Sequence, residues 1–297
     1  MSLADVFTFA PATGHVFSTS ERVALATSIP LLMEKSKRRT MLVWGKVYGF
    51  KNDYIIVQAF DDDLVAQPVI YYSVDGGLSF VFLGTTESLM QRTMDEVVNE
   101  KQKKMLMYRM RGPFMGDPSY EYRVVDELTG STSSYKESLR LVLFIDAHDF
   151  HCRVAPRGAY YRELRNATLP PEIKRNAAFT GLKRSHEEAL SLRNYYHLRA
   201  HNPYIEFIAK AEGSLLHAKS GLERLEEDQN LDAIFFPISD DLPGGVWRLR
   251  YDPVHNVVLG RNVRFVGSIF YHVPETNKYG TIYIGDGNIN HDIAFEL

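Results

Sequence analysis

The chain has 297 residues, of which 45% are hydrophobic and 24% are charged. These fractions are typical of globular proteins, and they exclude collagen-like, disulfide-rich and wholly disordered chains. Lys and Arg number 34 against 37 Asp and Glu, so the net charge is −3. This balance does not favour a nucleic-acid binder, because such domains carry an excess of basic charge.

Three features of the sequence predict a cytosolic protein. Cys152 is the only cysteine, so no intrachain disulfide is possible, which is typical of a reducing compartment. Residues 1–12 contain Asp5 and Pro11 and no basic region, unlike a signal peptide. The longest apolar runs fall far short of the roughly 18 residues that a membrane span needs. We therefore expect no membrane segment.

The N-terminal part of the chain predicts an arm followed by a helix. Residues 1–17 show no regular period, and we expect an N-terminal arm or an early edge segment there. Ser18 and Glu21 have the spacing of a capping box, which opens a helix. Pro30 should interrupt that helix, because proline removes a backbone donor.

Strands are expected from Met41 onward. Apolar runs separated by turn residues predict two hairpins, 41–50 with 54–60 and 69–74 with 78–83. Thr86 opens a polar helix that extends to about Lys104. The methionines after it could fill a core or form an adaptable contact surface; they are Met105, Met107 and Met110.

The middle of the chain predicts short elements. Gly116, Asp117 and Pro118 form a turn, because glycine allows a left-handed backbone and Asp caps its own turn. After this turn we expect a strand, a loop, a helix and two short strands, at 120–125, 130–134, 137–145, 151–155 and 159–161. The segment 137–145 could be a helix or a strand, and its spacing slightly favours a helix.

The last part of the chain begins with a second capping box. Ser185 and Glu188 predict a helix that runs to Pro203, and residues 204–230 are polar and expected to be helical. Strands are then expected at 246–251, 257–261, 265–273 and 281–284.

These elements together predict the fold class. Strand pairs joined by tight turns are antiparallel, since parallel pairs need long crossovers. Helices inserted between runs of strands indicate an α+β fold. We expect mostly antiparallel sheets and hairpins with a few amphipathic helices, in a single large domain over 18–297 that follows the arm of 1–17.

Motifs of common enzymes are missing from the sequence. Gly45-Lys46 is followed by Val47 and lies in a predicted strand, so it is not a P-loop. Gly285-Asp286-Gly287 lacks the third glycine of a dinucleotide site, and no Gly-x-Ser-x-Gly elbow occurs. We predict no catalytic residue and no cofactor.

Three clusters resemble metal sites, and each lacks a required residue. They are His197 with His201, His148 with His151 and Cys152, and Asp286 with Asn288 and Asn290. Leu198 stands where a zincin needs its glutamate, and the second cluster has no further cysteine as a fourth ligand. His291 and Leu297 replace the glycine and glutamate of a calcium loop. We therefore predict no metal site.

One stretch of the sequence carries a family resemblance. The segment 114–122, Phe-Met-Gly-Asp-Pro-Ser-Tyr-Glu-Tyr, resembles the most characteristic segment of the radial spoke head protein 9 family. Further similar blocks are Glu21-Arg22 through Pro30-Leu31-Leu32, Trp44-Gly45-x-Val47-x-Gly49 through Asp53-Tyr54, Pro156-Arg157-Gly158-Ala159, Phe179-x-Gly181-Leu182, Tyr196-His197-Leu198-Arg199, Asp241-Leu242-Pro243-Gly244-Gly245-x-Trp247, Phe270-Tyr271-His272-Val273-Pro274, and Tyr279-Gly280-x-Ile282-Tyr283-Ile284-Gly285. The later blocks are shared with the much longer spoke head proteins 4 and 6.

The resemblance implies a non-enzymatic scaffold subunit of the ciliary and flagellar axoneme. Such a subunit would pack with homologues of spoke head proteins 4 and 6 and other spoke subunits in a two-fold symmetric head. The head faces the central-pair projections and passes mechanical signals to the dyneins. Residues 204–228 and the N-terminal arm depart from the family's pattern.

The resemblance and the turn chemistry together name candidate structural or interface residues. They are Trp44, Gly116, Asp117, Pro118, Tyr120, Tyr122, Arg157, Trp247, Tyr271, Tyr279 and Tyr283. Alternation places Tyr120 and Tyr122 on one face of a strand. The 114–122 segment could be a turn that feeds a core strand or part of an interface, and Trp247 could be a buried anchor.

A second hypothesis comes from another class of protein. The chain could be a cytosolic enzyme or ligand-binding protein whose site assembles only in three dimensions. His148, His151 and Cys152 would be the nucleus of that site.

Overall fold

Helices and mostly antiparallel strands build the chain, and this confirms the predicted α+β class. A computed structural model describes residues 2–61, 67–84, 88, 100–125, 132–163, 172–198 and 236–293. The helices within these residues are α1 (Leu3–Phe9), α2 (Thr19–Ser36), α4 (Glu100–Arg109) and α5 (Glu137–Cys152), with 3-10 turns at η1 (Ala10–Thr13), η2 (Leu192–Asn194) and η5 (Ile238–Asp240). The strands are β1 (Thr40–Val47), β2 (Tyr54–Phe60), β3 (Val69–Ser73), β4 (Val81–Gly84), β5 (Glu121–Val125), β6 (Thr132–Lys136), β7 (Val154–Pro156), β8 (Tyr160–Glu163), β9 (Glu172–Arg175), β10 (Tyr195–His197), β11 (Trp247–Asp252), β12 (Val257–Asn262), β13 (Ser268–His272) and β14 (Tyr279–Gly285).

The largest sheet among the described residues has eight strands in the order β11-β12-β13-β14-β1-β2-β3-β4. β1 to β4 follow one another in antiparallel pairs, as the two predicted hairpins require. β14 instead pairs with β1 in parallel, with Gly45 opposite Tyr283. No short turn joins a parallel pair, so local sequence gives no sign of this one. In the part of the chain that the structure describes, three smaller sheets pair β5 with β6, β7 with β10, and β8 with β9.

The chain forms two compact units, and each is built from separated segments. Unit 1 comprises Met1–Cys152, Arg261–Ile269 and Thr281–Glu296, and unit 2 comprises Arg153–Gly260, Phe270–Gly280 and Leu297. The expected division into an arm of 1–17 and a domain of 18–297 stays a prediction.

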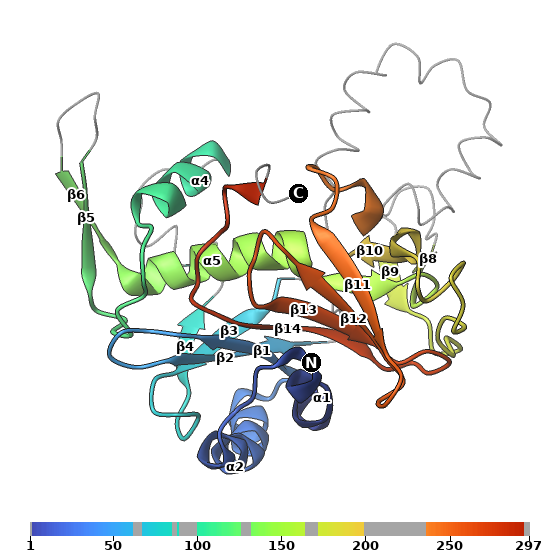
Figure 1. Cartoon of the computed structure of the whole chain (residues 1–297). Helices are drawn as coiled ribbons and strands as arrows, with labels where there is room; N and C mark the ends of the chain where they lie inside the picture. The colour runs from blue at the N-terminus through green and yellow to red at the C-terminus, as the bar shows by residue number, and fades with distance from the viewer. Residues whose placement is uncertain are drawn as a thin grey trace. The chain divides into compact units, whose positions relative to one another are not determined.

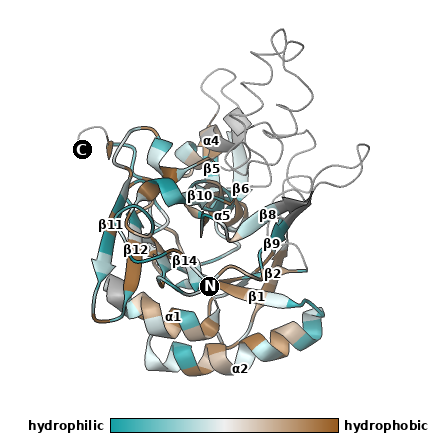
Figure 2. Ribbon diagram, turned by 90° about the vertical axis from the view of Figure 1, so that its right-hand side faces the viewer, coloured by the Kyte–Doolittle hydropathy of each residue, from teal (hydrophilic) through white to brown (hydrophobic). Residues whose placement is uncertain are grey.

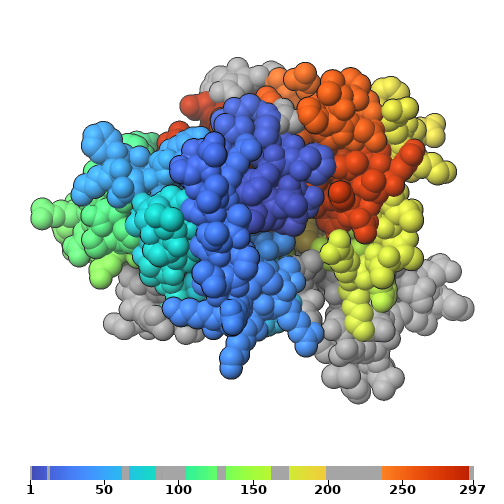
Figure 3. Space-filling view, turned by 90° about the horizontal axis from the view of Figure 1, so that it is seen from below, coloured from blue at the N-terminus to red at the C-terminus, as the bar shows by residue number. Residues whose placement is uncertain are grey.

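In unit 1 the sheet lies between helices. Every residue of β2 is buried, so both faces of the sheet are covered. α5 lies across one face, and α1 and α2 lie against the other (Figure 1). Hydrophobic residues dominate β1 in the side view (Figure 2), and α1 and α2 form the surface seen from below (Figure 3). This layered arrangement buries the aromatic side chains described in the next subsection.

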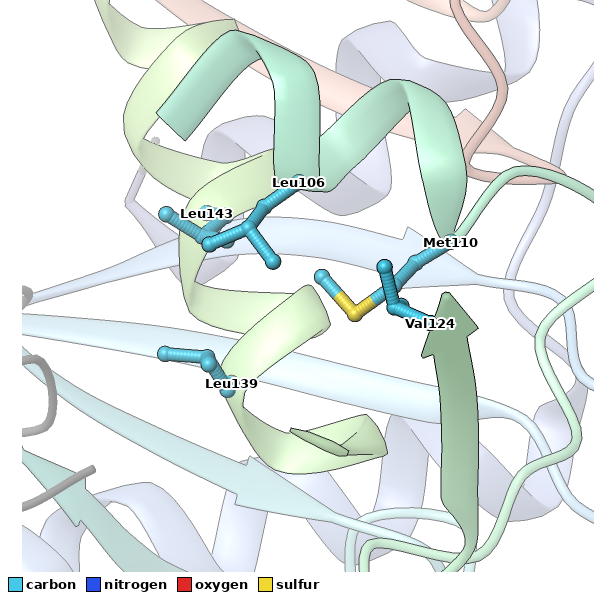
Figure 4. Close-up of a cluster of buried hydrophobic side chains, with 5 residues drawn as sticks. All are labelled: Leu106, Met110, Val124, Leu139 and Leu143. Carbon is cyan, nitrogen blue, oxygen red and sulfur yellow. The ribbon is translucent and has the colours of Figure 1, made fainter. Parts of the chain in front are cut away.

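A small hydrophobic cluster lies on the other side of α5. It consists of Leu106 and Met110 from the α4 segment, Val124 of β5, and Leu139 and Leu143 of α5 (Figure 4). Met110 is fully buried and Met107 packs against the cluster, whereas Met105 is half exposed. The methionine segment therefore supplies both a core residue and a surface residue.

The N-terminal third differs from prediction at two points. The expected arm is helical from Leu3 to Phe9, and Ser2 caps this helix by accepting a hydrogen bond from the amide of Asp5. Two helical turns are too short to show a clear period in the sequence. The α2 helix opens with the predicted capping box, but it continues through Pro30. Proline has no backbone N–H to donate to the carbonyl four residues earlier. Pro30 is exposed, so water can donate a hydrogen bond to that carbonyl instead.

The later elements differ in three places. The predicted loop at 130–134 is a strand from Thr132, and His151 and Cys152 end α5 rather than begin a strand. The predicted helix after Ser185 is wrong. The hydroxyl of Ser185 does accept a hydrogen bond from the amide of Glu188, but the chain continues through turns into β10. The predicted helix at 204–230 and most of the one at 86–104 lie outside the described residues.

Among the described residues, no helix is both long and apolar enough to cross a membrane.

Candidate interface segment and its supporting network

The segment 112–122, which carries the family resemblance, is held against the turn between β1 and β2. The amide of Phe50 donates to the carbonyl of Phe114 at 2.7 Å, and the amide of Lys51 donates to that of Met115 at 2.9 Å. Gly116 has a φ of 75°. A Cβ there would lie 2.1 Å from the carbonyl oxygen of Asn52, so only glycine fits this close approach. The prediction of a left-handed turn at Gly116 is confirmed.

Asp117 and Pro118 complete the turn that leads to β5. The carboxylate of Asp117 accepts hydrogen bonds from the amide and the hydroxyl of Ser119, at 3.1 and 2.6 Å. Lys51 lies 3.4 Å away on the surface. The Ser119 hydroxyl, the Ser119 amide and Lys51 together hold the pKa of Asp117 below its usual value. Asp117 thus acts as the predicted turn cap.

A buried carboxylate lies at the centre of this segment. Glu137, the first residue of α5, is fully buried and accepts hydrogen bonds from the amides of Met115, Gly116 and Asp117 at 2.7, 2.8 and 3.1 Å. The hydroxyls of Tyr54 and Tyr122 donate to it at 2.7 and 2.6 Å. Burial and then the hydrogen bond to Glu137 raise the pKa of both tyrosines, so both remain protonated donors. The dipole of α5 also favours a negative charge at this end.

Arg140, one turn along α5, balances the charge of Glu137 through a shared partner. It is almost fully buried and donates to the hydroxyl of Tyr122 at 2.6 Å. It also donates to the carbonyls of Gly112 and Pro113. Its guanidinium lies 3.9 Å from the ring centre of Phe114, a cation–π contact. Glu137 and Arg140 therefore fix both ends of the 112–117 turn to α5.

Sequence reasoning missed both of these residues. The only signal was a charged pair at the start of an otherwise apolar helix, Glu137 and Arg140 beside Leu139, Leu141 and Val142. Such charges are usually solvated, and only the approach of the 112–117 turn makes them a buried network.

Tyr120 and Tyr122, the two tyrosines of the segment, have different roles. Their rings meet edge to face with centroids 5.1 Å apart, which agrees with the predicted shared face. Tyr122 binds Glu137 and Arg140, whereas Tyr120 is 39% exposed. Tyr120 is therefore the tyrosine of this segment that a partner could reach.

Trp44 and Tyr283 belong to an aromatic core in unit 1. The indole nitrogen of Trp44 donates to Asp149 of α5 at 2.7 Å. Its ring lies 5.3 Å from Tyr283 and 4.7 Å from His148, centroid to centroid. Tyr283 is fully buried, and its hydroxyl accepts a hydrogen bond from the amide of Gly287 at 2.9 Å. Both candidates are structural residues of this core.

Trp247 and Tyr271 are buried in unit 2. The indole nitrogen of Trp247 donates to Asp241 at 2.8 Å, and the same carboxylate bonds to His197 at 2.8 Å. The Trp247 ring lies 5.5 Å from that of Phe270. Trp247 is therefore the buried anchor that its position after a glycine-rich turn predicted. Asp241, which no motif pointed out, orients it.

Two further candidates of unit 2 lie on the periphery of its core. Tyr279 is half-buried, with Phe179 edge to face at 6.2 Å and the Arg175 guanidinium 6.0 Å from its ring centre. Burial raises the pKa of its hydroxyl. Arg157 is exposed, and its backbone amide donates to Asn194.

The proposed enzyme nucleus near Cys152 is a packed interior. Cys152 and His148 are fully buried on α5. His148 bonds to Ser268 at 2.9 Å and packs edge to face against Phe265 and Tyr283. Burial lowers the pKa of His148, which favours the neutral ring. A substrate would have to displace this aromatic core to reach the thiol.

His197, from another of the clusters named in the sequence, has a structural role. His197 lies on strand β10 and not on a helix, and it bonds to Asp241, while His201 lies outside the described residues. Within the ranges that the structure describes, no group of three His, Cys, Asp or Glu side chains is placed to hold a metal ion.

The sequence was compared with those of known proteins. No family model matches the chain. It is 31% identical to a radial spoke head protein 9 homolog of Danio rerio over 298 residues, which cover 97% of this chain and 96% of the relative. The homologs of Homo sapiens and Bos taurus are each 31% identical, over 97% and 100% of the chain. The chain belongs to the radial spoke head protein 9 family.

Family membership confirms the resemblance that began with the 114–122 segment. The matches extend over 96% and 99% of the human and bovine relatives, so they cover both units and not one motif alone. The buried network around Glu137 supports the segment that most resembles this family.

Proposed function

We propose that the chain is a non-catalytic structural subunit of the axonemal radial spoke head. The observation that carries this proposal is the match to radial spoke head protein 9 homologs over nearly the whole chain. The buried surroundings of Cys152 and His148 support a structural role, because these residues pack the core. The protein would be made in the cytoplasm and reside in the axoneme of a cilium or flagellum.

The proposed partners are homologues of spoke head proteins 4 and 6 and other spoke head or stalk subunits, in a two-fold symmetric head. Through the head the chain would contact the central-pair projections indirectly and help to pass mechanical signals to the dyneins. Nucleic acid and membranes are not expected partners. Exposed apolar side chains on unit 1, such as Phe50 at 80% exposure and Tyr120, are suited to protein contacts.

Localisation and co-purification in a flagellated cell test this proposal. A tagged copy replaces the cell's own protein, and axonemes are extracted with detergent and then with salt. We expect the tagged chain to remain with the axoneme after detergent, to co-purify with homologues of proteins 4 and 6, and to restore swimming. A chain that leaves with the detergent fraction while the cells swim normally would contradict the proposal.

A Cys152→Ala variant separates the structural function from the enzyme alternative. The substitution removes the thiol, and a melting curve checks that the protein remains folded. A structural subunit should still enter the axoneme and restore swimming. A folded variant that enters the axoneme but leaves the flagella paralysed would favour chemistry at Cys152.

A further inference from the structure

The edge strand β11 presents a basic face. It stands at one end of the eight-strand order, so one of its edges pairs with β12 and the other pairs with no strand among the described residues. Arg248 and Arg250 are exposed, whereas Trp247 is buried and Leu249 is half-buried. Alternation puts both arginine side chains on one face of the strand, with their Cα atoms roughly 7 Å apart. Figure 2 shows the hydrophilic character of β11 beside the hydrophobic β12.

The two arginines are not held in ion pairs, although alternation places the carboxylate of Asp252 on the same face. The structure shows no ion pair or side-chain hydrogen bond from Arg248 or Arg250 to any residue that it describes. The carboxylate of Asp252, at the end of the strand, is engaged by the following turn: it accepts from the amide of Val254 at 2.9 Å and bonds to His255 at 2.7 Å. Two solvated cations at alternate positions therefore face outward.

Two strongly exposed apolar side chains lie before and after this strand in the sequence. Val254 is 84% exposed and Leu242 is 82% exposed, the highest values among the large hydrophobic side chains of the described residues. Val254 lies in the turn after β11, and Leu242 lies five residues before Trp247. Arginine is enriched at protein interfaces relative to the rest of the surface.

We propose that the β11 edge, with its exposed Arg248 and Arg250, binds an extended acidic segment of a partner protein. This inference deepens the proposed function, and it rests on that function for the identity of the assembly. Carboxylates at alternate positions of an extended segment have the same spacing as Arg248 and Arg250. Adding the segment as a strand places opposite charges side by side, and guanidinium groups can bind carboxylates through two hydrogen bonds.

A simpler explanation of the arginines makes a different prediction. Charged side chains on edge strands prevent unwanted strand pairing. If Arg248 and Arg250 serve only this purpose, no extended acidic peptide should bind there, and reversing their charge should not change binding to any partner.

A peptide with alternating charges tests the proposal in solution. The probe is a fluorescein-labelled octapeptide of alternating Glu and Val, mixed with the purified full chain, and anisotropy is measured at rising salt. We expect binding that weakens with salt, and a loss of about tenfold in affinity for the Arg248→Glu/Arg250→Glu variant. The matched Lys–Val peptide should bind this variant and not the original chain.

Control variants distinguish this surface from general electrostatics. Arg193→Glu/Lys278→Glu makes the same change in net charge at exposed sites of unit 2 outside β11, and it should leave binding of the Glu–Val peptide unchanged. All these side chains are exposed, so melting curves should be alike. Equal affinity of the original chain and the Arg248→Glu/Arg250→Glu variant, or no binding by either, would overturn the proposal.

The same variants in flagellated cells separate this inference from the proposed function. We expect Arg248→Glu/Arg250→Glu to be released from axonemes at lower salt than the original chain and the control variant. If the original chain itself fails to enter the axoneme, the proposed function is wrong. If the original chain enters the axoneme, and the Arg248→Glu/Arg250→Glu variant is released at the same salt concentration as the original chain, only the inference about β11 is wrong.

Discussion

Single residues hold the characteristic segment of this protein in place. Glu137 accepts three backbone and two tyrosine hydrogen bonds in a fully buried position. A buried carboxylate is tolerated only when its lone pairs are satisfied, and here donors surround it on several sides. The 112–117 turn therefore depends on the charge of this one side chain.

Glu137→Gln should destabilise the protein strongly. The amide keeps the shape of the side chain but replaces one acceptor oxygen with a donor that faces other donors. We expect a loss of about 3–5 kcal/mol in the free energy of unfolding, measured in urea. The exposed Glu121, which accepts a bond from Ser134, offers a control. Glu121→Gln should change stability by less than about 0.5 kcal/mol, and equal effects of the two substitutions would refute the buried network.

His272 makes stability depend on pH. Burial lowers its pKa to about 4 in the folded chain, against about 6.5 when unfolded. Its Nε2 accepts a hydrogen bond from the amide of Leu182, which requires the neutral ring. The stability that the neutral ring provides is complete above pH 6.5 and is lost as the pH falls toward 4, by about 3 kcal/mol.

Substitution of His272 checks this pH dependence. His272→Gln cannot take up the proton, so its free energy of unfolding should fall less between pH 7 and pH 4 than that of the original chain. His186→Gln, at an exposed position, serves as the control and should keep the original slope. Identical slopes for the original chain and His272→Gln would show that His272 does not contribute.

Among the elements, the parallel pair of β1 and β14 sets the tightest constraint. Gly45 has a φ of 149° and lies opposite Tyr283. A Cβ at this position would lie 1.9 Å from the carbonyl oxygen of Tyr283. Backbone atoms cannot move aside as a flexible side chain can, so the two strands meet only if residue 45 is glycine.

Gly45→Ala should therefore separate the two strands. We expect a loss of at least about 3 kcal/mol, or an insoluble protein, as judged by thermal melting. Gly244 is a matched control, because a Cβ there meets nothing within 4 Å. If Gly45→Ala melts at the same temperature as Gly244→Ala, the parallel pairing is not as close as described.

At the scale of the whole molecule, β14 is an inner strand of the largest sheet that the structure describes. β14 lies between β13 and β1 in the sheet order, and its residues contribute to both compact units. Ile282, Tyr283 and Ile284 are buried. Apolar ends of this kind fray unless they are docked, and here the strand is docked on both sides.

Deletion of residues 279–297 should remove solubility and incorporation into the axoneme together, because the sheet loses an inner strand. Expression of the shortened chain, alone and with a homologue of spoke head protein 4 or 6, measures the first effect. Axonemal localisation measures the second. A shortened chain that assembles into spokes of normally swimming cells would show that the terminus is dispensable.

Several features of the structure could be predicted from residues that lie close together in the sequence. The capping box at Ser18 and Glu21, the hairpins of β1 to β4, the turn at Gly116 and Asp117, and the α+β class each follow from residues close together in the chain. The segment 114–122 and its companion blocks also pointed to the correct family. These features were predictable because short-range hydrogen bonds and backbone preferences decide them.

Contacts between residues far apart in the sequence decided the features that could not be predicted. The predicted helix after Ser185 did not form, and β1 and β14 pair in parallel across more than two hundred residues. Glu137 lies two residues before Leu139 in sequence, but its charge is satisfied by a turn about twenty residues earlier. Burial and long-range pairing depend on which segments approach in space, and no local pattern carries that information. The sequence by itself determined the family, the turns and most of the strands; only the tertiary structure decided which charges are buried and which edge is exposed.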